Sequence, residues 1–147
     1  MKKAILEELY RNRLLNTKEE SEKFVNSINE MSEVVEEEDI VELCKVFDDD
    51  TKDDEIMFEL VHLIEVFSSE KAFELTILGI ANMVSTAQKW AKILVYRCLN
   101  DDFSRNMLKK AINLAEFQVQ QVIISLLDII KIEDFDKFGI YINEVLD

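Results

Sequence analysis

His62 is the only histidine of the chain, and histidine is the side chain best suited to proton transfer near neutral pH or to binding a metal ion. Glu59 and Glu65 lie close to it in the sequence, so a small hydrolase that uses His62 with one of these glutamates is one hypothesis. No nucleophile or oxyanion-stabilising motif accompanies them, and there is no phosphate loop, dinucleotide fingerprint, zinc-protease motif or CxxC pair. We therefore predict no enzyme, no catalytic residue and no cofactor, and expect His62 to bond a neighbour or to face a partner.

A run of carboxylates can be compared with a calcium-binding EF-hand loop. Asp48, Asp50 and Glu59 occupy the first, third and twelfth positions of such a loop. The fifth position is Lys52, and the sixth, where a glycine makes the sharp turn, is Asp53. A helical pattern also begins within these twelve residues. We therefore expect no metal site here.

The net charge of -14 is concentrated in the first half of the chain. Residues 1–75 contain 22 acidic and 9 basic residues, whereas residues 76–147 contain 9 and 8. Within residues 30–59, 14 acidic residues are balanced by only two lysines. Such a field repels nucleic-acid phosphates and anionic lipids and attracts basic proteins. We therefore expect a protein partner and no direct binding of nucleic acid or membrane. The alternative is that the acidic surface only keeps the protein soluble.

The composition predicts a single all-α domain that spans residues 1–147. This length is typical of one domain, and 48% hydrophobic residues supply enough apolar area for a core. Proline is absent and only two glycines occur, so the residues that tight β-turns require are missing.

A 3.6-residue period of apolar side chains predicts about eight or nine helices, which begin near residues 3, 17, 39, 53, 69, 85, 103, 119 and 133. Capping boxes are expected at Thr17 with Glu20 and at Ser85 with Gln88, and a serine cap at Ser69. The eighth helix should be the most buried. Short breaks favour antiparallel neighbours, which indicates a HEAT-like short α-solenoid, although an irregular helical bundle fits the same periodicity.

The cellular compartment is predicted from three further features. Cys44 and Cys98 each lie within an apolar helical pattern, as expected of buried thiols in a reducing compartment. The longest uncharged stretch, residues 75–88, is too short and too polar to span a membrane. Glu7 and Glu8 interrupt what would be the apolar core of a signal peptide. We expect a cytoplasmic protein.

Trp90 is the only tryptophan, and helical spacing places it on one face with Ile93 and Arg97. Tryptophan and arginine are frequent interface anchors. An interior helix of a stacked array buries two faces, however, which favours core packing of Trp90 over an interface role.

Several short motifs resemble those of a known family. They are the segment Leu43-Cys44-Lys45-Val46-Phe47-Asp48-Asp49-Asp50-Thr51, the helical stretch MFELVHLIE at residues 57–65, and Trp90 followed by Arg97 and Asn100. Over residues 15–100 the chain resembles the bacterial polymorphic-toxin immunity proteins of immunity protein family thirty. The resemblance implies a cytoplasmic protein that binds and neutralises a cognate toxin domain, and many such toxins are nucleases with basic grooves. Neither the toxin nor the oligomeric state follows from it.

The resemblance and the charge pattern together predict a toxin-binding surface. Its electrostatic part should consist of Asp48, Asp49, Asp50, Asp53, Asp54 and Glu55, with His62, Glu65 and Trp90 nearby. Helix capping and solvation should account for one or two of the five aspartates. The rival hypothesis is a helical-repeat adaptor that binds a peptide in an apolar groove.

Overall fold

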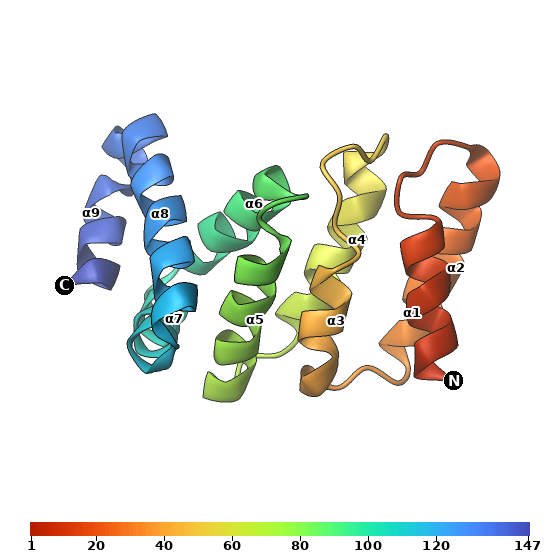
Figure 1. The fold of residues 1–147 in the computed structure, drawn as a ribbon, viewed down its shortest axis with the longest axis horizontal. Helices are drawn as coiled ribbons and strands as arrows, with labels where there is room; N and C mark the ends of the chain where they lie inside the picture. Colours follow the sequence, from red (N-terminus) through yellow and green to blue (C-terminus); the bar gives the residue numbers. More distant parts are fainter.

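The computed structural model describes all 147 residues and contains nine α-helices, one short 3-10 helix and no strand (Figure 1). The all-α prediction is confirmed. The helices are α1 (Lys2–Arg11), α2 (Lys18–Ser32), α3 (Ile40–Cys44), α4 (Asp54–Glu65), α5 (Glu70–Met83), α6 (Gln88–Leu99), α7 (Asp102–Leu114), α8 (Phe117–Glu133) and α9 (Phe135–Leu146), and the 3-10 helix η1 spans Glu37–Asp39. None of these helices is both long enough and apolar enough to cross a bilayer.

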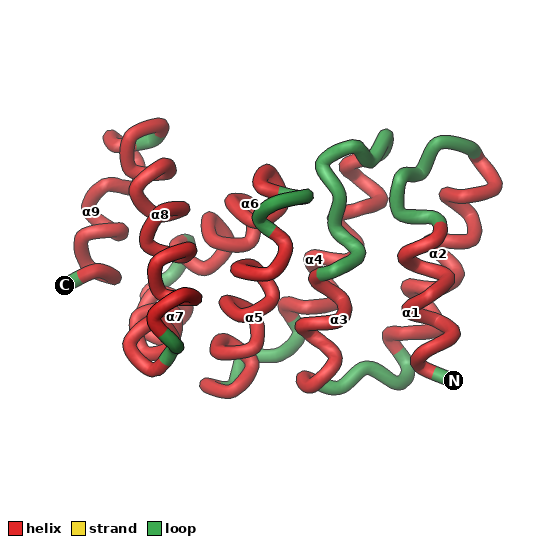
Figure 2. The backbone as a smooth tube through the Cα atoms, viewed as in Figure 1, coloured by secondary structure: helices red, strands yellow, loops and turns green.

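The helices follow one another along the long axis of the molecule, from α1 and α2 at one end to α8 and α9 at the other (Figure 1). Short loops join them at the two edges (Figure 2). Helix α1 packs on α2, α3 on α5, and α5 on α7. One cluster of 37 buried residues extends from Ile5 in α1 to Val145 in α9. Whether the array is HEAT-like remains a prediction.

Four of the nine α-helices, α2, α4, α5 and α7, begin at a local side-chain cap. The side chains of Thr17, Asp53 and Ser69 each accept a backbone hydrogen bond from the first turn of α2, α4 and α5. Glu20 does not close the predicted capping box with Thr17, because its carboxylate accepts from the backbone N–H of Asn16 and not from that of Thr17. The predicted box at Ser85 is wrong, since α6 begins after Ala87 and no local side chain caps it.

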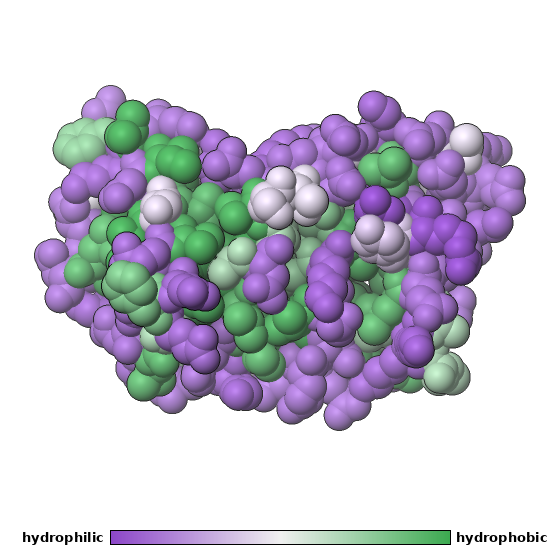
Figure 3. Space-filling view, viewed as in Figure 1, coloured by the Kyte–Doolittle hydropathy of each residue, from purple (hydrophilic) through white to green (hydrophobic).

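The prediction that the eighth helix is the most buried is wrong. In α8 only Ile123, Leu126, Leu127 and Ile130 are buried, while Phe117 is 71% exposed. Helix α8 contacts α5, α6, α7 and α9, but α8 and α9 form the last pair of the row, so no further helix covers the rest of its broad apolar stripe. Figure 3 shows the result, with apolar groups over α5 and α8 and mainly hydrophilic groups over α1 and α3.

Both cysteines are free and buried, as expected from their apolar surroundings. Burial raises the pKa of the Cys44 thiol to about 12 and, aided by the charges of Glu65 and Asp101, that of Cys98 to about 12. A thiol with so high a pKa stays protonated at neutral pH and is a poor nucleophile. The two cysteines therefore act as small packing residues.

Candidate functional site

The acidic loop between α3 and α4, residues 45–53, is held to the rest of the fold by its own aspartates. Asp48 accepts a hydrogen bond from Nε of Arg13 at 3.2 Å, which links the loop to the chain after α1. The other oxygen of the same carboxylate accepts from the backbone N–H of Asp50 at 2.9 Å. Both contacts fix the shape of the loop, so the Asp48 carboxylate is not free to meet a partner.

Asp49 caps a helix that lies 40 residues further along the chain. Its carboxylate accepts from the backbone N–H of Lys89, in the first turn of α6, at 3.0 Å. Its own backbone N–H donates to the carbonyl oxygen of Thr86 at 3.4 Å. Asp49 thus caps α6, the role that was expected of Ser85.

Asp53 and Asp54 also have partners within the protein. Asp53 caps α4 by accepting from the backbone N–H of Ile56 at 3.1 Å. Asp54 forms an ion pair with Lys89. Four of the five aspartates are therefore bonded internally: Asp49 and Asp53 cap helices, Asp48 and Asp54 bind cations, and only the side chain of Asp50 lacks a partner. A run of aspartates gives no sign of which cations and backbone groups lie opposite, so the sequence alone could not separate these roles.

We expect Asp49→Ala to lower the free energy of unfolding by about 1 kcal/mol, the usual loss when a capping side chain is removed. Urea denaturation followed by circular dichroism measures it. Asp50→Ala is the matched control, because the Asp50 side chain is exposed and bonds nothing, and it should change stability by less than about 0.5 kcal/mol. Equal effects of the two substitutions would contradict the capping role of Asp49.

An outward stripe of α4 is acidic and has no internal partners. Glu55, Glu59 and His62 are exposed and follow one another at helical spacing, so they share one face. Asp50 is exposed in the loop that precedes this helix. We call these four residues the α4 acidic face. Glu59 was absent from the predicted surface, although the same spacing that places His62 there could have found it.

Glu65 lies at the end of α4 and binds Arg97 of α6. Nε and one terminal nitrogen of Arg97 donate to the two carboxylate oxygens of Glu65, each at 2.7 Å. These hydrogen bonds raise the pKa of Arg97 above its ordinary value. A bidentate pair of this kind fixes both geometry and charge. It fastens the C-terminal ends of the two helices together.

Trp90 is fully buried, so it occupies a core position and is not an exposed interface anchor. Its ring stacks on Phe47, with centroids 5.6 Å apart, and meets the edge of Phe58 at 5.3 Å. The indole N–H has no hydrogen-bond partner. Because Phe47 precedes the acidic loop and Phe58 lies on α4, Trp90 supports the candidate surface from beneath and cannot contact a partner itself.

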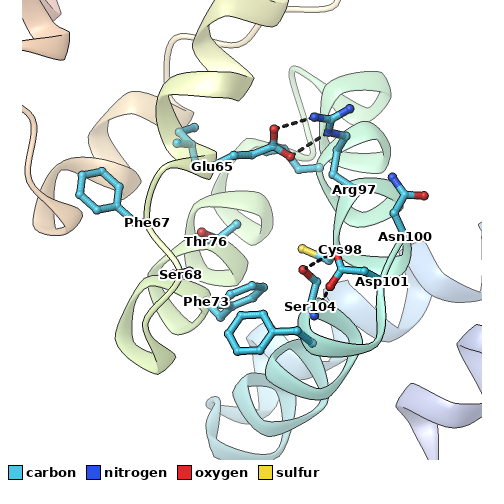
Figure 4. A pocket seen from close by; sticks show the side chains of 13 residues that line it. Glu65, Phe67, Ser68, Phe73, Thr76, Arg97, Cys98, Asn100, Asp101 and Ser104 are labelled. Atoms are coloured by element: carbon cyan, nitrogen blue, oxygen red, sulfur yellow. Dashed lines mark hydrogen bonds and ion pairs between the residues drawn. The ribbon is translucent and has the colours of Figure 1, made fainter.

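A cleft opens beside the Glu65–Arg97 pair (Figure 4). Its volume is about 420 Å³, and it lies where α4 and α6 end and α5 and α7 begin. The lining residues are Ile64, Glu65, Phe67, Ser68, Phe73, Thr76, Leu94, Arg97, Cys98, Asn100, Asp101, Phe103 and Ser104. The sequence did not reveal this cleft because its lining comes from four helices and the loops between them, and Phe103 is 55% exposed in it.

No three His, Cys, Asp or Glu side chains lie close enough together to hold a metal ion. Of the three carboxylates compared with a calcium loop, Asp48 is bound to Arg13 and to the backbone N–H of Asp50, whereas the side chains of Asp50 and Glu59 are exposed.

Comparison with known proteins identifies the family. No curated protein and no solved structure matches the chain. The family model described as Immunity protein 30 matches residues 11–108, which include the acidic loop, all of α4 and every residue that lines the cleft. Helices α8 and α9 lie outside the match. The predicted family resemblance is confirmed, and the chain belongs to the Immunity protein 30 family.

Proposed function

We propose that this protein neutralises a cognate toxin domain by binding it through the α4 acidic face, formed by Asp50, Glu55, Glu59 and His62. The family match supports an immunity function. We further propose that it acts by binding and not by catalysis, and that it does so in the cytoplasm.

The observation that best supports this surface is the absence of internal partners for its carboxylates. Arg13, Lys89 and backbone N–H groups neutralise the neighbouring aspartates. No cation of the protein pairs with Asp50, Glu55 or Glu59. Unpaired exposed carboxylates on one helix face produce a negative potential that an opposite charge on a partner can offset.

A basic partner follows from the sign of this potential. A toxin that binds nucleic acid needs a groove rich in lysine and arginine, because phosphate contacts dominate such binding. The acidic face would occupy that groove and exclude the substrate. Long-range attraction between the two surfaces would also speed association, with an effect that decreases as salt is added.

The combined substitution Asp50→Asn, Glu55→Gln and Glu59→Gln tests the proposal. We expect association with the toxin domain encoded by the neighbouring gene to slow by about tenfold or more at low salt, since the change removes three charges from the surface that attracts the partner. Stopped-flow association rates at several salt concentrations measure it, and growth rescue in cells that express the toxin gives an independent readout.

Glu116→Gln, Asp128→Asn and Asp136→Asn together form the matched control. These side chains are also exposed and unpaired, and they change the net charge equally, but they lie on or before α8 and α9. We expect a change of less than about threefold, because charges farther from the contact are screened by salt. Equal slowing by both triple variants would leave only a net-charge effect and would contradict a defined acidic face. Absence of any complex would refute the proposed function.

A further inference from the structure

The cleft beside the Glu65–Arg97 pair has an apolar floor and one aromatic wall, with polar and charged groups around them. Ile64 and Leu94 are buried in its floor. Phe73 and Phe103 form one wall, with their ring centroids 6.3 Å apart and their planes nearly perpendicular. In Figure 4 the ring of Phe73 lies on the side of the cleft opposite Glu65 and Arg97.

One wall of the cleft contains an aromatic ring that is more than half exposed. Phe103 is 55% exposed although its helix has a strongly amphipathic pattern with a buried face of its own. Water must hydrate this ring in the isolated protein, which is unfavourable for apolar surface. A partner side chain that filled the cleft would remove that surface from water.

The charged groups of the rim are Glu65 and Arg97, which pair with each other, and Asp101, which leaves one net negative charge. Asp101 adds a carboxylate that accepts from the backbone N–H and the hydroxyl of Ser104, at 2.8 and 3.1 Å. Asn100 is exposed and its side chain bonds nothing in the protein.

We infer that this cleft receives a large apolar side chain of the toxin domain, one that protrudes from a basic surface. The inference rests on the proposed function and adds a second contact to the α4 acidic face. Glu65 is three residues beyond His62 on the same helix, so the two contacts adjoin. The volume of about 420 Å³ is within the range of pockets that bind small organic groups.

The two contacts should affect different rate constants of binding, because one is charged and the other is apolar. Exposed charges mainly set the rate of association, whereas a buried apolar anchor mainly sets the rate of dissociation. The cleft should therefore contribute affinity that salt does not remove. The acidic face should contribute speed that salt does remove.

Ser68→Trp tests the inference by filling the cleft from within the chain. Ser68 lines the cleft, is exposed and makes no side-chain hydrogen bond, so the substitution deletes no native contact. We expect the Kd for the toxin domain encoded by the neighbouring gene to rise by at least about tenfold, mainly through faster dissociation and equally at low and high salt. Surface plasmon resonance with the full-length protein measures both rates.

Ser125→Trp is the matched control, because Ser125 is exposed on α8, bonds nothing with its side chain and lies away from the cleft. It should leave the Kd within about twofold of the wild-type value. Thermal unfolding of both variants checks that each is folded. If Ser68→Trp does not fold, Phe103→Ala replaces it, and we expect a faster dissociation of at least about fivefold from loss of the exposed wall.

Two outcomes would overturn the inference, and they are distinguishable. If the cleft variants bind as well as wild type while the charge variants associate slowly, the cleft is not part of the interface and the proposed function stands. If wild type itself forms no complex, both the function and the inference fail.

Discussion

Trp90→Ala should lower the free energy of unfolding by about 3 to 5 kcal/mol, the usual range for truncating a large buried aromatic side chain. Trp90 is 0% exposed and is packed between Phe47 and Phe58. A domain of this size is typically stable by only about 5 to 15 kcal/mol, so this single change removes a large part of its stability. Urea denaturation must be followed by circular dichroism, because the substitution removes the only tryptophan.

Phe117→Ala is the control for this prediction. It also truncates an aromatic ring, but that ring is 71% exposed, and we expect a change of less than about 0.5 kcal/mol. A loss of less than about 1 kcal/mol for Trp90→Ala would be incompatible with a ring packed between two aromatic neighbours. Because Phe47 leads into the acidic loop, the variant should also weaken toxin binding at temperatures where it remains folded.

Helix starts were predictable from the sequence wherever the capping residue is local. Thr17, Asp53 and Ser69 each lie just before the first helical turn and bond within three residues. A motif of this kind depends on backbone geometry that neighbouring residues share, so the sequence contains all the information. The same reasoning failed for α6, where Ser85 and Gln88 match the motif but Asp49 provides the cap.

The acidic loop shows what residue counting could not predict. The sequence predicts a strongly negative segment, and the charge count is correct whatever the fold. Which carboxylates remain available depends on tertiary neighbours such as Arg13 and Lys89, which lie 35 residues from their partners Asp48 and Asp54. Separation along the chain hides such contacts. The candidate surface therefore moves from the loop to the outward stripe of α4.

The same contacts join helix α4 to helix α6. Asp49 and Asp54 both bind Lys89, by its backbone N–H and by its ammonium group, and so join α6 to the start of α4. Glu65 and Arg97 join the other ends of the same two helices. Helix α4 is thus fixed at both ends. A face fixed in this way loses little conformational entropy when it binds, which favours affinity.

Gly79→Ala should lower the free energy of unfolding by about 1 to 3 kcal/mol, because it overpacks the contact between α3 and α5. A Cβ atom at this position would lie 2.5 Å from Sγ and 2.9 Å from Cβ of Cys44, both far inside normal contact distance. Alanine is the better helix former by about 0.5 to 1 kcal/mol, which offsets part of the effect. Chemical denaturation measures the net change, and stabilisation would contradict the close approach of the two helices.

Gly139→Ala separates this packing effect from helix propensity. Gly139 also lies within a helix, and its new Cβ would approach the ring of Phe135 at 2.9 Å. That ring is 59% exposed and can rotate away, whereas Cys44 is buried and cannot move without shifting α3. We therefore expect Gly139→Ala to be neutral or slightly stabilising.

Adding Cys44→Ala to Gly79→Ala should recover at least about 1 kcal/mol relative to the sum of the single changes, since it removes the shorter of the two clashes. Strict additivity would mean that the clash with Sγ is relieved elsewhere, and the helix that leads into the acidic loop would then be less rigidly placed than its packing against Gly79 implies.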